Sequence, residues 1–457
     1  MIVKLNLKNS MVRILFVVYL VFFIVTNIFS QTRIINIKDY GAKGNGLSDD
    51  TKAVQEAINA AKVRSASVYL PKGTYLVSSI TILCNLSGEN GTVIKRKAQQ
   101  KLSKFDFCLI RNQNNLSLNN ITFDGSVKVT TKREVIDGGT PLFVYGSRNI
   151  QIQNCIFRNS PQSGLRLEAS SNIQINYCSA INSNGNFGDG YYFNGCSSVQ
   201  VRNCKADDYT RIGFVTENNS SNILFDNCRA SNGHDGSVLY GGREYNAGFW
   251  YENSGNITTI ACVAEKNKHY GFVATTGKNV GKVIKGDYAS YRFENCNSLN
   301  NAVGFQVSSV SVAVRININN CNVVNASRGY VATANNRMDQ FYFNNCNITL
   351  KPITSSALNS AGFMWESPVT VKSPGNTLPL FSYKNCYIQY EANVDIEKVI
   401  DMKNNNGDIS TYSGGKARVE VDNVKNSLKG EETIIKARRG QPVYRIANTK
   451  VFSRFKK

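Results

Sequence analysis

The sequence has 457 residues, of which 42% are hydrophobic and 19% are charged. Its 53 lysine and arginine residues outnumber the 32 aspartate and glutamate residues, and the resulting net charge of +21 attracts polyanions. A helix that crosses a bilayer needs about 20 apolar residues. The longest apolar run of the chain, residues 14–25, is shorter than this, so we expect no membrane-spanning helix in the rest of the chain.

Residues 1–30 predict a secretory signal peptide. Lys4, Lys8 and Arg13 precede the apolar run, and a small residue, Ser30, ends the segment. Cleavage removes these three positive charges and no acidic residue, so the net charge falls from +21 to +18. We expect a secreted, periplasmic or cell-surface protein without a membrane span after cleavage; an uncleaved anchor is the alternative.

Export and positive charge together predict the partner. An exported basic protein meets acidic polysaccharide or an anionic cell surface, so we expect an acidic polysaccharide and no nucleic acid. A basic composition that serves no charged partner is the alternative. The oligomeric state stays open.

Residues 31–110 are predicted to form an N-terminal cap and the first coils of a solenoid. Ser48, Asp49 and Asp50 are favourable helix caps. An apolar stripe at helical spacing follows them, formed by Ala53, Val54, Ala57, Ile58 and Ala61. A short amphipathic helix here would cover the exposed end of the first coil.

Three short motifs follow one another in this region: DYGAKG at 39–44, DDT at 49–51 and LPKGTY at 70–75. They resemble the opening of the pectate-lyase-like superfamily of right-handed parallel β-helix proteins. Its members include pectate and alginate lyases, polygalacturonase-type hydrolases, mannuronan epimerases and phage tailspikes. The resemblance implies an all-β, right-handed parallel β-helix with an N-terminal capping helix, and it leaves the activity open because members with different activities share this opening.

Residues 111–391 contain a repeat that ends in asparagine and cysteine, as in NIQIQNC, at spacings of 23 to 26 residues over most of the array. Strand-like alternation with an asparagine at the corner predicts one coil of a parallel β-helix per repeat. Stacked coils lie about 4.8 Å apart, so the cysteines should form a column of buried free thiols rather than disulfides. The column comprises Cys155, Cys178, Cys204, Cys228, Cys262, Cys296, Cys321, Cys346 and Cys386.

A second strand in each coil begins with glycine, and its side chains alternate between the two faces of the sheet. The first residue after each glycine should form an inward stack: Leu165, Tyr191, Phe214, Phe249, Phe272, Phe305, Tyr330 and Phe363. The second and fourth residues should point to solvent. The second-position column is Arg166, Tyr192, Val215, Trp250, Val273 and Gln306, and the fourth-position column is Glu168, Asn194, Glu217, Glu252, Thr275 and Ser308.

This outward strip is the predicted functional site. Aromatic faces such as those of Tyr192 and Trp250 stack on sugar rings, and carboxylates supply acid, base or calcium-ligand chemistry. Glu217 and Glu252 belong to adjacent coils, so we expect them about 5 Å apart, near the spacing of a retaining glycosidase pair. A solvated strand face that carries glutamates by chance is the alternative. Calcium is the one cofactor considered, and its ligands are unassigned.

Two insertions carry further polar residues, and loops on a rigid scaffold are where binding groups collect. The first insertion contains His234, Asp235 and Arg243, and Lys268 and His269 follow one coil later. His234 and His269 are the only histidines of the chain and precede glycine-led strands in consecutive coils. This placement favours a functional role.

Part of the insertion resembles the catalytic stretch of mannuronan epimerases and alginate lyases. Asp235 matches an aspartate of that stretch, and Lys268-His269 matches its basic-histidine pair. The family's Asp-Pro-His falls on Val215-Thr216-Glu217, which leaves only Glu217 as a substitute.

Another set of residues resembles the polygalacturonase-type pattern. Asp189, the pair Asp207-Asp208 and Gly233-His234 occur in the family's order. The Asp-Asp pair lies earlier in its coil than in the family, Asp235 follows His234, and the family's arginine-lysine motif is absent.

Three functions remain open at this point. The first is an exported polysaccharide lyase or epimerase acting on a uronate-containing polysaccharide, with Arg243 or Arg211 as cation, His234 or His269 as base, and Tyr240 or Tyr270 as acid. The second is a glycoside hydrolase that uses Glu217 with Glu252 or Glu168, or Asp207 with Asp208. The third is a non-catalytic glycan-binding or adhesin module.

The candidate residues fall into two groups. The catalytic candidates are His234, Asp235, Glu217, Glu252, His269 and Arg243. The substrate-binding candidates are Arg166, Tyr192, Trp250, Asp207, Asp208, Arg211 and Lys268. Residues 392–457 lose the repeated phrase and are predicted to form a closing cap or a strand laid along the last coils.

Overall fold

The fold is described from a computed structural model of the chain. The described residues are 33–97, 107–126, 139–185, 187–234, 246–276, 288–310, 312–351, 360–367, 377–390, 399, 407–411, 416–428, 432–437 and 443–452. The predicted signal segment lies outside them. Within these ranges no helix is both long enough and apolar enough to cross a membrane.

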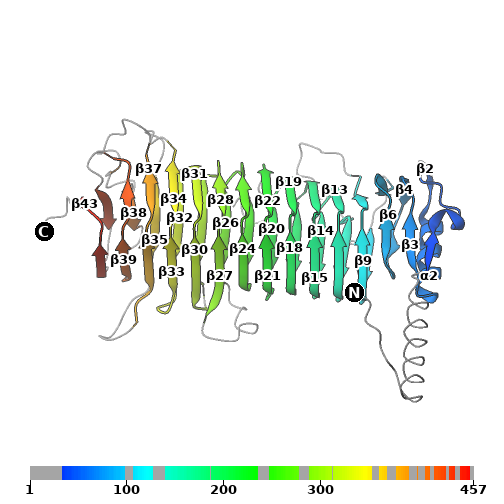
Figure 1. The fold of residues 1–457 in the computed structure, drawn as a ribbon, viewed down its shortest axis with the longest axis horizontal. Coiled ribbons are helices and arrows are strands. Elements are labelled where there is room, and N and C mark those ends of the chain that lie inside the picture. The colour runs from blue at the N-terminus through cyan, green and yellow to red at the C-terminus, as the bar shows by residue number, and fades with distance from the viewer. Residues whose placement is uncertain are drawn as a thin grey trace, which may run out of the picture.

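Three long parallel sheets, here called A, B and C, run the length of the molecule, and each coil contributes a strand to each sheet in turn (Figure 1). Sheet A has 15 strands: β1 (Ile34–Asn36), β3 (Ser67–Leu70), β6 (Leu86–Gly88), β9 (Asn114–Asn119), β12 (Arg148–Gln153), β15 (Ser171–Asn176), β18 (Ser197–Arg202), β21 (Ser221–Asp226), β24 (Gly255–Ile260), β27 (Ala289–Glu294), β30 (Val314–Asn319), β33 (Gln340–Asn344), β36 (Leu380–Lys384), β39 (Arg418–Asp422) and β42 (Val443–Ala447).

Sheets B and C have 14 strands each. Sheet B comprises β2 (Asn45–Asp49), β4 (Gly73–Val77), β7 (Thr92–Arg96), β10 (Thr122–Asp124), β13 (Ile156–Ser160), β16 (Ser179–Ser183), β19 (Lys205–Tyr209), β22 (Arg229–Gly233), β25 (Val263–Glu265), β28 (Asn297–Leu299), β31 (Asn322–Ala326), β34 (Asn347–Leu350), β37 (Tyr387–Gln389) and β40 (Lys425–Asn426). Sheet C comprises β5 (Ile80–Thr81), β8 (Cys108–Arg111), β11 (Leu142–Tyr145), β14 (Leu165–Glu168), β17 (Tyr191–Asn194), β20 (Ile212–Glu217), β23 (Ala247–Glu252), β26 (Tyr270–Thr275), β29 (Val303–Ser308), β32 (Arg328–Thr333), β35 (Ala361–Glu366), β38 (Gly407–Thr411), β41 (Thr433–Ala437) and β43 (Val451–Phe452).

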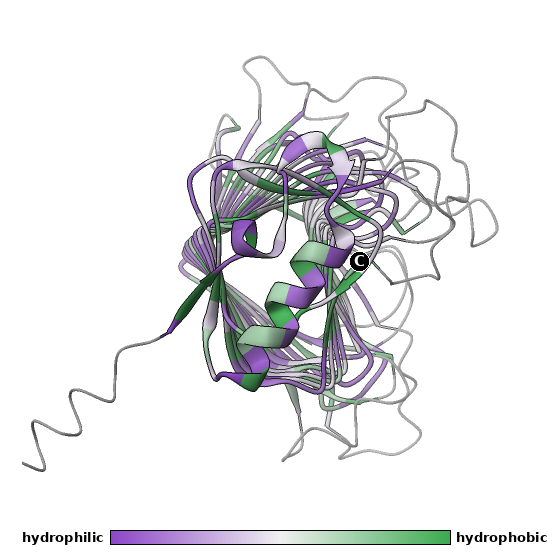
Figure 2. Ribbon diagram, turned by 90° about the vertical axis from the view of Figure 1, so that its right-hand side faces the viewer, coloured by the Kyte–Doolittle hydropathy of each residue, from purple (hydrophilic) through white to green (hydrophobic). Residues whose placement is uncertain are grey.

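The predicted all-β, right-handed parallel β-helix is therefore confirmed. Viewed along its axis, the three sheets enclose one continuous core (Figure 2). The predicted helix is α2 (Thr51–Val63), which buries Val54, Ala57, Ile58 and Ala61 and follows a short 3-10 turn, η1 (Ile37–Tyr40). Figure 2 shows α2 lying across the end of the coil. That it caps this end against further strand pairing stays a prediction.

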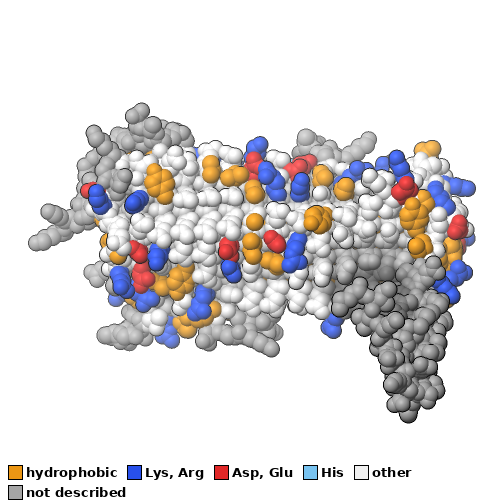
Figure 3. All heavy atoms as spheres, in the orientation of Figure 1, with side chains coloured by type: hydrophobic (Ala, Val, Ile, Leu, Met, Phe, Trp, Pro, Cys, Tyr) orange, Lys and Arg blue, Asp and Glu red, His pale blue; other side chains and the backbone are white. Residues whose placement is uncertain are grey.

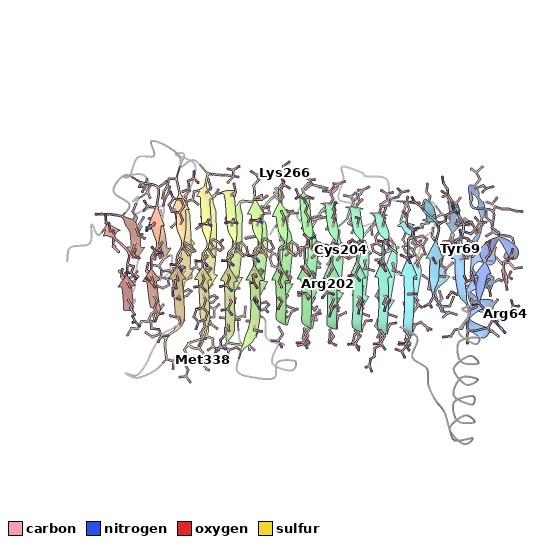
Figure 4. All side chains as sticks on the ribbon, viewed as in Figure 1. Arg64, Tyr69, Arg202, Cys204, Lys266 and Met338 are labelled. Carbon is pink, nitrogen blue, oxygen red and sulfur yellow. The ribbon has the colours of Figure 1, made fainter. Side chains whose placement is uncertain are left out.

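The inward columns are as predicted. All twelve cysteines are free thiols, and the nine of the repeat are buried where sheet A turns into sheet B, the corner at which Figure 4 labels Cys204. Their thiols donate to carbonyl groups of the preceding coil, as Cys228 does to Val201 at 3.4 Å. The aromatic column stacks face to face: the ring centroids of Phe214 and Phe249 are 4.9 Å apart, and those of Phe249 and Phe272 are also 4.9 Å apart.

The corner asparagines adopt a left-handed backbone that other residues reach only at a cost. Asn203 and Asn227 have φ of 54° and 52°, and the Asn227 side-chain amide donates to the Asn203 side chain at 2.7 Å. At one corner the chain carries Ala261 instead, with φ of 51°. Alanine gains nothing from this conformation, whereas asparagine tolerates it and extends the ladder of amides.

We expect Ala261→Asn to raise the free energy of unfolding by about 1 kcal/mol and Asn227→Ala to lower it by a similar amount, because a left-handed conformation costs alanine roughly 1–2 kcal/mol. Both positions are exposed, so no packing changes. Urea unfolding followed by circular dichroism measures both variants. Equal and opposite shifts support the argument, and shifts of the same sign contradict it.

The coils continue beyond residue 391, contrary to the predicted cap or single strand. Strands β38 to β43 extend all three sheets. The segment VEVDNV repeats the usual phrase: Val419 and Val421 point inward, and Asn423 turns the corner with φ of 51°. Buried Val424 stands where the other coils have cysteine, which is why the repeat is hard to recognise here.

Candidate active site on sheet C

A cavity of about 290 Å³ lies on the outer face of sheet C. Two predicted catalytic residues line it: Glu217 at the end of β20 and Glu252 at the end of β23. Val215 pairs with Trp250 and Thr216 with Tyr251, so the glutamates that follow come from neighbouring coils in the same register. The complete lining is Arg211, Ile212, Glu217, Asn218, Trp250, Glu252, Asn253 and Thr275.

The outward direction of the second-position column is confirmed by the register, but its exposure to solvent is not. Tyr192, Val215 and Val273 are only 6%, 0% and 4% exposed. Tyr192 and Val215 form a separate apolar cluster with Ile212, against which Trp250 packs. The prediction of a wetted strip is therefore wrong at these positions, because apolar side chains on the outer face bury one another. Of this cluster, Ile212 and Trp250 line the cavity.

A buried ion pair underlies one side of the cavity. The guanidinium of Arg211 donates to both carboxylate oxygens of Asp189, at 2.7 and 2.6 Å, and both side chains are less than a tenth exposed. Burial lowers the pKa of Arg211, but the Asp189 carboxylate raises it by more, so the net pKa lies above its usual value. Arg211 is thus a fixed cation rather than a mobile substrate clamp.

Glu217 is held by two groups. The Tyr192 hydroxyl donates to its carboxylate at 2.7 Å, and the Arg211 guanidinium lies 3.6 Å from it. Burial raises the pKa of Tyr192, and the nearby Glu217 carboxylate raises it further, so the phenol stays a hydrogen-bond donor. The Glu217 carboxylate is therefore held in place by a hydrogen-bond donor on one side and a cation on the other.

Glu252 has the opposite environment. Burial raises the pKa of its carboxyl above the ordinary value of 4.5, and the Glu217 charge raises it further. Arg211 and a hydrogen bond from the Trp250 side chain act in the other direction without cancelling the shift. Glu252 therefore keeps its proton to a higher pH than an ordinary glutamate does.

Two further predicted residues lie on neighbouring coils of the same face. Arg166 pairs with Glu168 through its Nε, 2.6 Å from the carboxylate, and its guanidinium lies 4.1 Å from the centre of the Tyr192 ring. Neither Arg166 nor Glu168 lines the cavity. Arg166 reaches the cavity only indirectly: it lies over the Tyr192 ring, and the Tyr192 hydroxyl contacts Glu217.

The acidic and histidine candidates lie elsewhere. Asp208 in β19 pairs with His234, Oδ1 to Nε2 at 2.8 Å, and both side chains are close to half exposed. Asp207 accepts hydrogen bonds from Ser231 and Asn232 at 2.9 and 2.7 Å. These residues gather at the corner between sheets B and C, and they are not among the residues that line the cavity.

The two histidines do not stack on each other. The Lys268 amide donates to the Gly233 carbonyl, which aligns Lys268 rather than His269 with His234. The His269 ring lies 6.1 Å from the Tyr270 ring, which lies 6.0 Å from the Trp250 ring. His269 is therefore connected to the edge of the cavity through one aromatic residue, and it does not line it.

Asp235 and Arg243 lie outside the described residues, as does Tyr240. Within the described part of the chain, no three His, Cys, Asp or Glu side chains gather as a metal-binding group. Sequence reasoning missed the cavity residues Asn218 and Asn253. The sequence contains a signal for them, because each asparagine directly follows one of the two glutamates. Each has a φ of 49°, and this left-handed conformation turns the chain at the rim of the cavity.

The coil defines the fold class: the chain is a right-handed parallel β-helix protein, the fold that the N-terminal motifs predicted. Residues 34–238 match a family model described as "Rhamnogalacturonase A/epimerase, pectate lyase-like". The A-module of mannuronan C-5 epimerase AlgE6 from Azotobacter vinelandii has a similar structure, with 16% identity, a TM-score of 0.51, and coverage of 92% of this chain and 99% of that chain.

Curated relatives match over short stretches. Alginate lyase 7 of Azotobacter vinelandii is 59% identical over 44 residues, which is 9% of this chain and 5% of that protein. The preneck appendage protein of Bacillus phage PZA is 26% identical over 234 residues, 49% of this chain and 23% of that protein. The matches thus span less than a quarter of each of these two relatives.

Proposed function

We propose that this protein is an exported glycoside hydrolase that cleaves a polysaccharide in the sheet C cavity. The observation that carries the proposal is the pair Glu217 and Glu252, from adjacent coils and with opposite environments. A pair of carboxyl groups, one of which has a raised pKa, can provide an acid and a base, or an acid and a nucleophile.

The roles follow from the environments. Protonated Glu252 donates its proton to the glycosidic oxygen as the bond to the anomeric carbon breaks. Glu217, which is positioned by the Tyr192 hydroxyl and lies next to Arg211, attacks that carbon and forms a glycosyl ester. Water then hydrolyses the ester, with Glu252 accepting its proton. Adjacent coils are about 4.8 Å apart, which favours this retaining route over the wider spacing of inverting enzymes.

The charges of the cavity favour hydrolysis over β-elimination. Arg211 is the one cation among the lining residues, and it is already paired with Asp189. A uronate carboxylate at the reacting sugar would therefore lack a cation of its own and would lie next to Glu217 and Glu252. The chain's net charge of +21 draws an acidic polymer to the protein as a whole, so acidic groups are accommodated away from the cleaved bond.

A uronate lyase or epimerase is the second candidate. Arg211 favours it, because a guanidinium at the cavity wall is the kind of cation that neutralises a uronate carboxylate. The short match to an alginate lyase points in the same direction. In this case the Glu217–Tyr192 pair would remove the C5 proton and protonate the leaving oxygen.

Product chemistry separates the two reactions. We expect incubation with neutral glucans, xylan, polygalacturonate and alginate to release new reducing ends from at least one polymer without ultraviolet absorption. Absorption near that of an unsaturated uronate supports the lyase candidate and contradicts hydrolysis. Glycan binding without turnover of any polymer contradicts both and favours an adhesin.

The pH profile follows from the direction of the Glu252 shift. Hydrolysis needs Glu252 protonated, so kcat should fall as pH rises through its pKa, which lies above 4.5. We expect the rate to be highest on the acidic side of neutrality and to decline toward alkaline pH. A rate that keeps rising above neutral pH contradicts the assignment of Glu252 as the acid.

A further inference from the structure

The outer face of sheet A carries a second hollow region. It lies on a different side of the coil from the sheet C cavity. Two depressions of about 350 and 670 Å³ lie along it and share Ser198 and Gln200. Together they extend from β12 to β30, seven strands in sequence. Six spacings of about 4.8 Å make a groove roughly 29 Å long, parallel to the axis.

The lining is almost free of charge. Its outward side chains are mostly amides and hydroxyls, such as Gln151 and Thr258, with the apolar Leu224 among them. The one charged lining residue is Arg292, which is paired with Glu294. Figure 3 shows this side of the molecule, where broad areas carry no hydrophobic or charged side chains.

The amides are arranged in register along the groove. Gln151, Gln174 and Gln200 pair in successive coils. Beside them the Asn172 amide donates to Asn149, and Asn149 donates to Asn115. These asparagines have left-handed backbones, and this conformation explains why asparagine occurs at these positions. The glutamines lie on regular strand backbone, so the backbone conformation does not explain why glutamine occurs there.

The ligand chemistry follows from this lining. Each amide offers both donors and an acceptor, and the hydroxyl groups of a sugar chain do the same. A nucleic acid or an acidic polysaccharide requires cations, which the groove lacks although the chain has a net charge of +21. We propose that the outer face of sheet A from β12 to β30 binds an uncharged polysaccharide chain lying parallel to the coil axis, as a site separate from the sheet C cavity.

Affinity electrophoresis of the full chain tests this proposal. The Glu217→Gln/Glu252→Gln variant removes turnover, and gels contain dextran, laminarin, galactomannan or xylan, with polygalacturonate and alginate as acidic comparisons. We expect at least one neutral polymer to retard the protein. Adding Gln151→Ala, Gln174→Ala and Gln200→Ala should weaken that binding about tenfold or more, since each lost hydrogen bond contributes about 1 kcal/mol.

A matched control uses the same strands. Gln153→Ala with Asn176→Ala changes outward amides of β12 and β15 that do not line either depression, and it should leave the retardation unchanged. Thermal unfolding midpoints equal to that of the parent show that all variants are folded. Retardation by acidic polymers alone, by no polymer, or with equal loss in the control overturns the proposal. Loss of binding on Trp250→Ala alone also overturns it, because the polymer would then sit in the sheet C cavity.

Discussion

Replacing Glu252 by glutamine is expected to lower kcat by about 10²- to 10⁴-fold, the usual contribution of a positioned general acid. Glutamine has nearly the same shape but cannot donate the proton to the leaving oxygen. The side chain is partly buried next to Trp250 and this burial raises its pKa, so the fold should tolerate the uncharged amide. Initial rates of reducing-end release measure the effect.

Two controls make this experiment specific. Glu168→Gln changes a glutamate at the same strand position three coils earlier, where it pairs with Arg166 and does not line the cavity, so kcat should stay close to that of the parent. An aryl glycoside with a good leaving group needs little help from an acid, so its hydrolysis should be much less impaired by Glu252→Gln. Equal losses in Glu168→Gln and Glu252→Gln contradict the assignment.

The pH dependence adds a second signature. In the parent protein the decline of kcat on the basic side reports loss of the Glu252 proton. Glu252→Gln has no proton to lose at this position, so the residual rate should no longer decline there. A variant that merely perturbed the fold would lower the rate at every pH and keep the shape of the profile.

The sequence predicts the interior of this protein better than its surface, for a physical reason. A column such as Cys204, Cys228 and Cys262 depends on two local properties, strand alternation and a constant repeat length, and both can be read from the chain. The repeat is lost to inspection after residue 391 because Val424 replaces the cysteine, although it fills the same buried position. Volume and polarity, not the thiol, are what the corner requires.

The outer face depends on contacts that alternation does not determine. The sequence correctly places Glu217 and Glu252 on one strip, but it cannot show that Val215 and Tyr192 bury each other on that face. It also missed the pairing of Arg211 with Asp189. Asp189 directly precedes the glycine of its strand, whereas Arg211 lies two residues before the glycine of the next coil. The two residues therefore do not occupy equivalent positions of the repeat, and no column brings them together.

The same limit applies to His234. The sequence places His234 among the catalytic candidates, whereas the structure pairs it with Asp208 at another corner, away from the residues that line the cavity. Whether a residue before a glycine-led strand reaches the strand's outer face depends on the turn that precedes it. The turn is the least regular part of each coil, because insertions are placed there.

Asp189→Asn is expected to lower the free energy of unfolding by about 3–5 kcal/mol, because it leaves the Arg211 charge buried without its counterion. The amide retains the shape of the side chain but loses the charge that raises the pKa of Arg211. Urea unfolding measures the change. Replacing both residues by leucine should cost less than Asp189→Asn alone, since a buried pair exchanged for apolar side chains is often close to neutral.

An exposed ion pair provides the comparison. Arg292 and Glu294 pair on the surface of sheet A with side chains 55% and 26% exposed, and Glu294→Gln should cost only about 0–1 kcal/mol. Arg211 also lies 3.6 Å from Glu217, so Asp189→Asn should let the guanidinium shift toward that carboxylate and lower kcat in the molecules that remain folded. If Asp189→Asn cost no more than Glu294→Gln and left kcat unchanged, Arg211 would not be a fixed cation. The opposite environments of Glu217 and Glu252 would then need another cause.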